Sequence, residues 1–185
     1  GRPLTISKLT EQVPAIVEGW FLGTETGNAI ADVLLGKYNP SGKLTMSFPR
    51  NVGQIPVFYN YRQSGRPGTD KLTKWTNRFI DSPVSPLYPF GYGLSYTTFS
   101  YSAPRVSQKE FSTNEILKVS VDVTNTGQYD GEETIQLYIR DVIASVTRPV
   151  KELKGFKKIF LRKGETRTVG FELRAEDLSF LSQDM

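Results

Sequence analysis

The C-terminal half of the chain alternates hydrophobic and polar residues with the period of a β-strand. Residues 117–123 place an aliphatic side chain at every second position, and the same alternation returns at 135–139 and 169–173. Turn-forming sequences lie between these stretches, at residues 125–127 and 163–165. Short strands with one apolar face each, joined by turns, are typical of an antiparallel β-sandwich. We therefore predict a β-sandwich in this half of the chain.

The first third of the chain has a different pattern, in which helical and extended stretches alternate. We expect a weak helix, an apolar stretch of strand length, a second helix and a second strand, at residues 10–19, 16–22, 28–35 and 44–48. Thr24 is positioned to cap the second helix, and Gly36 is positioned to end it. The order helix, strand, helix, strand predicts the edge of an α/β fold.

Between Asn51 and Pro89 the periodicity disappears, and Pro, Gly, Asn and aromatic residues accumulate. A loop of this length is usually functional or a linker. Its aromatic side chains need a surface to pack against, which argues against simple disorder. We interpret this segment as a loop that is draped over another surface.

The composition limits the chemistry that the chain can perform. Its 185 residues include no His and no Cys, so imidazole catalysis, thiolate nucleophiles, disulfides and metal sites built on those side chains are excluded. We expect no cofactor and no metal site. The net charge of +4 comes from residues 1–95, without a nucleic-acid-binding motif, and no apolar run is long enough to span a membrane. We therefore expect neither nucleic acid nor a membrane as a partner.

Two short motifs are typical of catalytic sites but have plainer explanations. The segment 36–43 has the wrong spacing for a phosphate-binding loop and precedes a predicted strand rather than a helix. Glu25 and Asp32 are two helical turns apart, about 10 Å, which is marginal for a glycosidic acid/base pair. Glu25 is also expected to complement the start of the helix, and Asp32 to lie on its solvated side. We favour structural roles for both carboxylates.

Two further segments allow a binding function. The basic run at 151–163 could meet an acidic polymer, but Glu152 interrupts it, and a solvated strand face with a turn is the favoured interpretation. Three apolar residues interleave with this run as expected core positions: Leu153, Phe156 and Ile159. The aromatic segment 88–96 could stack on sugar rings, but it lies between the two periodic regions, and we favour a joint between domains.

A series of motifs runs through nearly the whole chain in a fixed order. They lie at residues 1–4, 23–34, 39–44, 48–50, 53–56, 59–61, 65–67, 87–99, 123–127 and 145–156. Together they resemble the second half of glycoside hydrolase family 3 enzymes, most of all the bacterial periplasmic β-glucosidase subgroup. The resemblance implies an α/β sandwich that ends within residues 1–57, an aromatic connector and loop at 58–95, and a fibronectin type III-like domain at 96–185. We expect this last domain to be truncated, and the chain to start within a larger protein.

The resemblance also implies an activity for the parent protein, namely hydrolysis of terminal β-linked glucose from oligosaccharides by a retaining, exo-acting β-glucosidase. Its nucleophilic Asp and its acid/base Glu are expected upstream of Gly1, so no catalytic residue is assigned here and the fragment alone is predicted to be inactive. Substrate-binding roles are expected for four loop residues: Tyr59, Asn60, Arg66 and Trp75. The expected partners are a glucoside or oligosaccharide, the other domains of the enzyme, and a second copy in a homodimer. The expected location is periplasmic or extracellular. The alternative is a non-catalytic carbohydrate- or protein-binding β-sandwich module, which requires an exposed aromatic strip after Tyr96.

Overall fold

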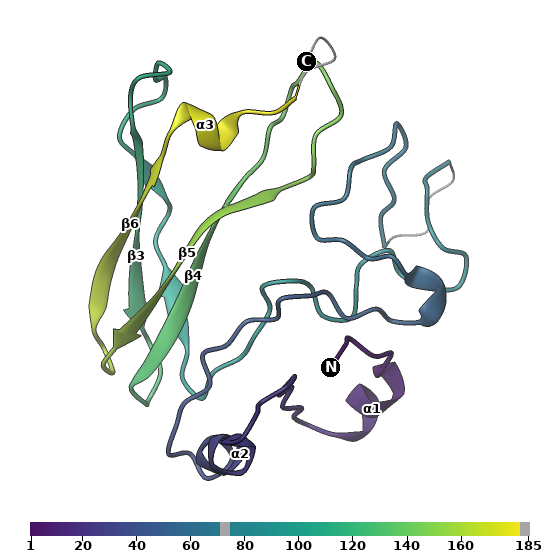
Figure 1. The fold of residues 1–185 in the computed structure, drawn as a ribbon, viewed down its shortest axis with the longest axis vertical. Coiled ribbons are helices and arrows are strands. Elements are labelled where there is room, and N and C mark those ends of the chain that lie inside the picture. The colour runs from purple at the N-terminus through teal and green to yellow at the C-terminus, as the bar shows by residue number, and fades with distance from the viewer. Residues whose placement is uncertain (71–74, 182–185) are drawn as a thin grey trace. The chain divides into compact units, whose positions relative to one another are not determined.

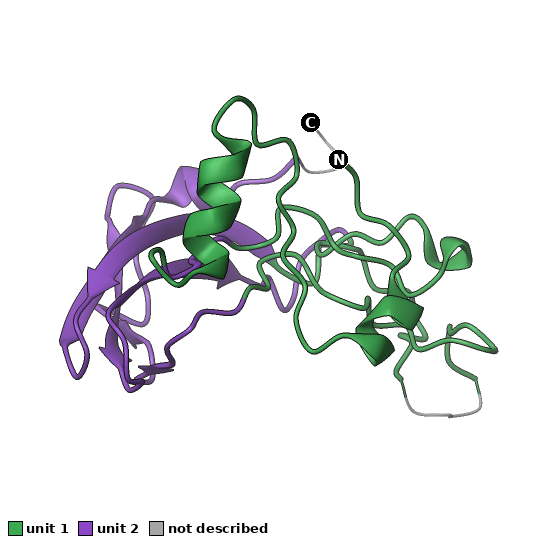
Figure 2. Cartoon of the chain, turned by 90° about the horizontal axis from the view of Figure 1, so that it is seen from below, with its two compact units in different colours: residues 1–38, 43–93, 147–151 green, residues 39–42, 94–146, 152–185 purple. Residues whose placement is uncertain are grey.

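The computed structural model describes residues 1–70 and 75–181, and the chain divides into two compact units (Figure 2). Unit 1 consists of residues 1–38, 43–93 and 147–151. Unit 2 consists of residues 39–42, 94–146 and 152–185. The chain passes from unit 1 to unit 2 between Gly93 and Leu94, within the aromatic segment 88–96.

Unit 2 is built from two antiparallel sheets (Figure 1). Its elements are β1 (Phe99–Tyr101), β2 (Arg105–Val106), β3 (Leu117–Asn125), β4 (Gly131–Ile139), β5 (Glu152–Leu161), β6 (Thr166–Leu173) and the short helix α3 (Ala175–Leu178). β6 pairs along one edge of β3, so β1 and β2 pair with successive parts of its other edge. β4 pairs with β5 to form the second sheet. The strands predicted from alternation are confirmed as β3, β4 and β6.

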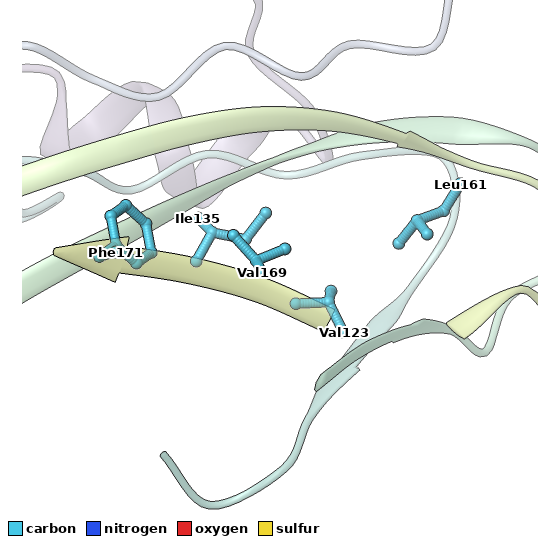
Figure 3. Packing of buried hydrophobic residues seen from close by; sticks show 5 residues of the cluster. All are labelled: Val123, Ile135, Leu161, Val169 and Phe171. Carbon is cyan, nitrogen blue, oxygen red and sulfur yellow. The ribbon is translucent and has the colours of Figure 1, made fainter. Parts of the chain in front are cut away.

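The hydrophobic core of unit 2 lies between these two sheets (Figure 3). Val123 of β3 and Leu161 of β5 have no exposed surface, and three other residues complete the cluster: Ile135, Val169 and Phe171. Successive strand residues point to opposite faces, so the alternating aliphatic positions all reach one interior. Burial of such side chains contributes about 1.5–3 kcal/mol each to folding.

The expected core position of Phe156 is wrong, because its side chain is 68% exposed. Leu161 is fully buried, so the residues at odd positions of β5 face the interior. A period of two places Ile159 on the inner face and Phe156 on the outer one. A β-bulge shifts the register beyond Gly155, so Leu153 pairs with Tyr138 rather than with a residue of the core face, and its expected core position is also wrong. Phe160 shares the outer face and is 48% exposed. The expected core residues are three positions apart, whereas the side chains of a strand return to the same face at every second position.

Asn125 joins the end of β3 to three surrounding segments of unit 2. Its fully buried side chain donates hydrogen bonds to the carbonyl oxygens of Tyr129, at 2.8 Å, and Leu161, at 3.1 Å. Its Oδ1 accepts hydrogen bonds from the Thr97 hydroxyl, at 2.8 Å, and from the Gly127 N–H, at 3.1 Å. A buried amide with its donors and acceptor satisfied fixes one conformation of the surrounding backbone.

Unit 1 contains the helices α1 (Ser7–Gln12) and α2 (Thr26–Leu34) and the short 3₁₀ turn η1 (Val52–Gln54). The helix expected at 10–19 is wrong, since α1 ends at Gln12, ahead of Pro14. The helix expected at 28–35 is confirmed as α2, with Glu25 rather than Thr24 at its N-cap position. Gly36 follows with φ +72°, which confirms it as the helix stop.

Neither of the strands expected in the first third of the chain forms as predicted. The apolar stretch 16–22 is not a buried strand, and Phe21 is 89% exposed. Residues 44–48 form only an isolated bridge, between Phe48 and Tyr88. The α/β pattern of unit 1 therefore lies in its order of helical and extended segments, and not in a sheet of its described residues.

Candidate functional site

The candidate site is a cavity of about 400 Å³ that lies within unit 1. It is lined by Pro3, by residues 45–47, 49 and 55–60, and by Phe90. The backbone of residues 44–48 runs antiparallel to that of 88–92, with the Phe48 N–H donating to the Tyr88 carbonyl at 2.8 Å and the Leu44 N–H to the Tyr92 carbonyl at 2.8 Å. This pairing brings the aromatic segment against the extended segment and forms one wall of the cavity.

Stacked aromatic rings shape the cavity and the packing around it. The rings of Tyr59 and Phe90 stack with their centroids 4.2 Å apart, and the Phe90 N–H donates to the Ser47 hydroxyl at 3.1 Å. Tyr88 stacks on Tyr92 and meets Phe48 edge-on. The aromatics at 88–92 therefore pack against one another and against residues of unit 1.

The lining of the cavity suits a ligand with an apolar face and a polar edge. Most of the wall is aliphatic or aromatic, and its polar groups are hydroxyls and one amide, those of Thr45, Ser47, Tyr59 and Asn60. No charged residue lines it among the described residues. Such a wall can bind and orient a ring by packing and hydrogen bonds, but its described lining supplies no carboxylate for acid–base catalysis.

The four expected substrate-binding residues separate into two pairs. Tyr59 and Asn60 line the cavity, whereas Arg66 and Trp75 do not. Arg66 and Trp75 lie on two limbs of the loop that are joined by a hydrogen bond from the Asn77 N–H to the Arg66 carbonyl, at 2.9 Å. Trp75 is 79% exposed and has φ +70°. A non-glycine residue held in the left-handed region costs about 1–3 kcal/mol, and such residues cluster at functional sites.

The carboxylates on α2 have structural partners. Glu25 accepts a hydrogen bond from the side chain of Asn28 at 2.7 Å, and Asp32 lies 3.9 Å from the ammonium group of Lys37. Both contacts are local to the helix and its C-terminal end. Within residues 1–70 and 75–181, no group of acidic side chains is arranged to hold a metal ion.

A polar network at the base of the long loop was not identified by sequence reasoning. The buried side chain of Gln54 accepts the Arg50 N–H at 2.8 Å and donates to the Ser85 carbonyl at 2.9 Å. The Arg50 guanidinium also donates to the Ser85 carbonyl, at 2.9 Å. The network therefore joins the two ends of the loop. Gln54 lies in one of the motifs of the family resemblance, residues 53–56, and this motif was the available signal.

Comparison with known proteins identifies the family. Residues 1–96 match the glycosyl hydrolase family 3 C-terminal domain. The chain belongs to glycoside hydrolase family 3. Residues 133–185 match the fibronectin type III-like domain. The first match therefore covers all of unit 1 except residues 147–151, and the second includes β5 and β6 of unit 2.

Individual relatives of this family 3 chain match it along its whole length. The periplasmic beta-glucosidase of Salmonella typhimurium is 54% identical over 186 residues, which are 100% of this chain and 24% of that protein. A beta-xylosidase of Formosa agariphila is 49% identical, over 100% of this chain and 25% of that protein. The crystal structure of a beta-glucosidase from Listeria innocua in complex with isofagomine matches with a TM-score of 0.94 and 47% identity, over 100% of this chain and 26% of that one. The chain thus spans about a quarter of the length of these relatives.

Proposed function

We propose that this chain is the C-terminal part of a retaining, exo-acting β-glucosidase that removes terminal β-linked glucose from oligosaccharides. The observation that carries the proposal is that the whole of this chain matches β-glucosidases of family 3, at 54% identity in one case. The relatives include a β-xylosidase, so the choice of glucose over xylose rests on the greater identity to the β-glucosidase. By the same resemblance, the parent enzyme is periplasmic or extracellular.

In this enzyme the chain supplies binding surface and scaffold rather than the reacting carboxylates. Retaining glycosidases need two carboxyl groups about 5–5.5 Å apart across the scissile bond. The α2 carboxylates, Glu25 and Asp32, have the local partners described above, and the cavity contains no charged group. By the family resemblance, the nucleophile and the acid/base residue are proposed to lie upstream of Gly1.

The loop contributes to the sites that bind the leaving part of the substrate. The apolar cavity beside the stacked Tyr59 ring supports this role for Tyr59 and Asn60. The exposure of Trp75 in a left-handed conformation supports a contact with a ligand there, and Arg66 lies on the limb joined to it. The exposed apolar side chains of unit 1 are proposed to face the other domains of the enzyme, as the ends of an α/β sandwich domain would.

A second candidate function is favoured by the outer face of β5. Phe156 and Phe160 are both exposed there, and they lie four positions apart along the strand, a distance of about 13 Å. An exposed aromatic strip on the sandwich is the feature that a carbohydrate-binding module requires. Replacement of both residues by Ser should abolish retention of the chain on an insoluble β-glucan if this module exists. Unchanged retention, or no retention of the unaltered chain, would argue against it.

The primary proposal is tested with the full-length protein and with the 185-residue chain. The full-length protein should hydrolyse an aryl β-glucoside, and proton NMR should show β-glucose as the first product, because a double displacement retains configuration. The 185-residue chain should show no hydrolysis at its verified mass of 20.8 kDa. Hydrolysis by this chain would contradict the site assignment, and inverted product or an inactive full-length protein would contradict the proposed function.

A further inference from the structure

The long loop between η1 and the aromatic segment is fastened at a second point beyond its base. Asp70 lies near the middle of the loop, yet its carboxylate meets Val84 and Ser85 close to the end. Oδ1 accepts the N–H groups of Val84, at 2.8 Å, and Ser85, at 3.0 Å. Oδ2 accepts the Ser85 hydroxyl at 2.6 Å. Asp70 is thereby bound to the same residue that Gln54 and Arg50 hold through its carbonyl oxygen.

This second contact divides the loop into two lobes that carry different expected binding residues. The first lobe, residues 55–69, contains Tyr59, Asn60 and Arg66. The described residues of the second lobe are 75–83, and they include Trp75. Asp70 stands at the boundary between the two lobes, and its carboxylate binds Ser85. The position of this boundary, and so of both lobes, therefore depends on the contact between Asp70 and Ser85.

The two lobes are also joined to each other, beyond Asp70. The Asn77 N–H donates to the Arg66 carbonyl, and the Asn77 side chain donates to the Ser64 hydroxyl at 2.6 Å. The backbones approach so closely that a Cβ on Gly68 would collide with the carbonyl oxygen of Asn77. This contact requires the lobes to lie at one fixed separation, so a shift of either lobe at Ser85 moves the limbs that bear Arg66 and Trp75.

Hydrogen bonds, rather than burial, hold this part of the loop. Asp70 is exposed, as are Arg66, Trp75 and Asn77. The Ser85 hydroxyl and then the Ser85 and Val84 N–H groups hold the pKa of Asp70 below its usual range, so the acceptor stays ionised under ordinary conditions. Charge-assisted hydrogen bonds are stronger than neutral ones, and three on one carboxylate can order a segment that has no apolar core.

We propose that Asp70 is a positioning residue for substrate binding, which acts by fixing both lobes of the loop to Ser85 and so holding Arg66 and Trp75 in the geometry that binds the leaving part of the substrate. The inference rests on the proposed β-glucosidase activity and adds a specificity determinant to it. Asp70 itself makes no contact with substrate in this role. Its removal costs affinity because a loop that must be ordered on binding lowers the net binding free energy.

The experiment compares Asp70→Ala, Asp70→Asn and the matched control Asp81→Ala in the full-length enzyme. Asp81 is an exposed carboxylate of the same loop, and among the described residues its side chain has no hydrogen bond or ion pair. For cellobiose, Asp70→Ala should raise KM by about three- to ten-fold while kcat stays within about two-fold, the signature of lost uniform binding. Asp70→Asn keeps one acceptor oxygen, so its KM should lie between those of Asp70→Ala and the unaltered enzyme. Asp81→Ala should leave both constants unchanged.

Limited trypsin digestion supplies a readout that does not depend on activity. Cleavage after Arg78, followed by mass spectrometry, should be faster in Asp70→Ala than in the unaltered enzyme or in Asp81→Ala. Faster cleavage with an unchanged KM would overturn the inference, because Asp70 would then hold the loop without serving the substrate. An equal rise in KM for Asp70→Ala and Asp81→Ala would overturn it too, as an effect of charge alone. If Asp70→Ala does not fold, an unchanged KM in the folded Asp70→Asn variant overturns it. An unaltered enzyme that does not hydrolyse cellobiose or an aryl β-glucoside refutes the proposed function instead.

Discussion

The two units of this chain place their apolar side chains in opposite ways. In unit 2, seven hydrophobic side chains of the described residues are buried, and five of them form the cluster between the sheets. In unit 1, Phe48 is the one such side chain within the described residues, and neither α1 nor α2 buries any residue. Unit 1 instead exposes Phe21 and Leu34 together with most of its other large apolar residues.

The difference shows what holds each unit together. The strands of unit 2 supply both faces of their own core, so hydrophobic burial stabilises it from within. Unit 1 is held by polar contacts, such as those of Gln54 and Asp70, and by the aromatic pairs near the cavity. An amphipathic helix such as α2 gains little stability without a surface for its apolar face. We therefore expect substitutions to affect the two units very differently.

The largest contrast should come from a matched pair of leucines. Leu161→Ala in unit 2 should lower the free energy of unfolding by about 4 kcal/mol, because it leaves a cavity at a fully buried position. Leu34→Ala on α2, where the side chain is 65% exposed, should change it by less than about 0.5 kcal/mol. Urea denaturation of the 185-residue chain measures both. Equal losses of stability would contradict the difference between the two units. A larger loss for Leu34→Ala in the full-length enzyme than in the 185-residue chain would show that other domains cover α2.

A second pair compares two asparagines. Asn125→Ala should destabilise unit 2 by about 3 kcal/mol, because it leaves buried carbonyl oxygens and donors without partners. Asn28→Ala removes only an exposed hydrogen bond to Glu25 and should cost less than about 0.5 kcal/mol. Thermal unfolding followed by circular dichroism distinguishes the two. A small effect of Asn125→Ala would mean that water replaces its contacts.

A third pair of substitutions should have opposite signs. Gly127→Ala would place a Cβ against the Thr97 hydroxyl oxygen and 2.5 Å from the Thr98 nitrogen, so the backbone must move, at a cost of about 2 kcal/mol. Gly27→Ala lies in α2 with no atom near the added Cβ, and should stabilise the chain by about 0.5 kcal/mol through a less flexible unfolded state. Differential scanning calorimetry gives both signs. Stabilisation by Gly127→Ala would contradict the close approach at that turn.

The smallest effect concerns pH and the surface of unit 2. The two hydrogen bonds from the Arg105 guanidinium, at 2.7 and 2.8 Å, and one from the Thr168 hydroxyl hold the pKa of Asp122 well below its usual range. A lowered folded-state pKa contributes stability above the unfolded-state pKa of about 3.9 and loses it as the pH falls below that value. Arg105→Gln should therefore reduce the drop in melting temperature between pH 6 and pH 3, slightly because the pair is exposed. The exposed Lys109→Gln removes the same charge elsewhere and should leave the drop unchanged, and an equal change in both would refute the specific pairing.

Much of unit 2 was predictable because strand alternation is a local signal. The aliphatic positions of β3, β4 and β6 have a period of two, and the turn at Gly164 has the glycine that its φ of +78° requires. Phe156 was predicted wrongly as a core residue. In this run of basic and apolar residues, more than one spacing can be chosen for the side chains that face the core. The burial of Leu161 determines which period applies.

Unit 1 was predicted less well, because its order depends on contacts between distant residues. The end of α2 at Gly36 follows from local sequence, whereas α1 and the segment 44–48 depend on what packs beside them. Of the expected site residues, Tyr59 and Asn60 meet at the cavity, while the placement of Arg66 follows from Asn77, eleven positions away. Their roles in binding substrate stay predictions.

The sequence alone determined the family, the strands β3, β4 and β6 and the absence of imidazole and thiol chemistry, since motif order, alternation and composition are properties of the linear chain. Only the tertiary structure revealed that Asp70 and Gln54 meet at Ser85, and that Phe156 faces outward. A hydrogen bond between residues 15 or 31 positions apart depends on the path of the backbone between them. No local pattern of residue types encodes that path.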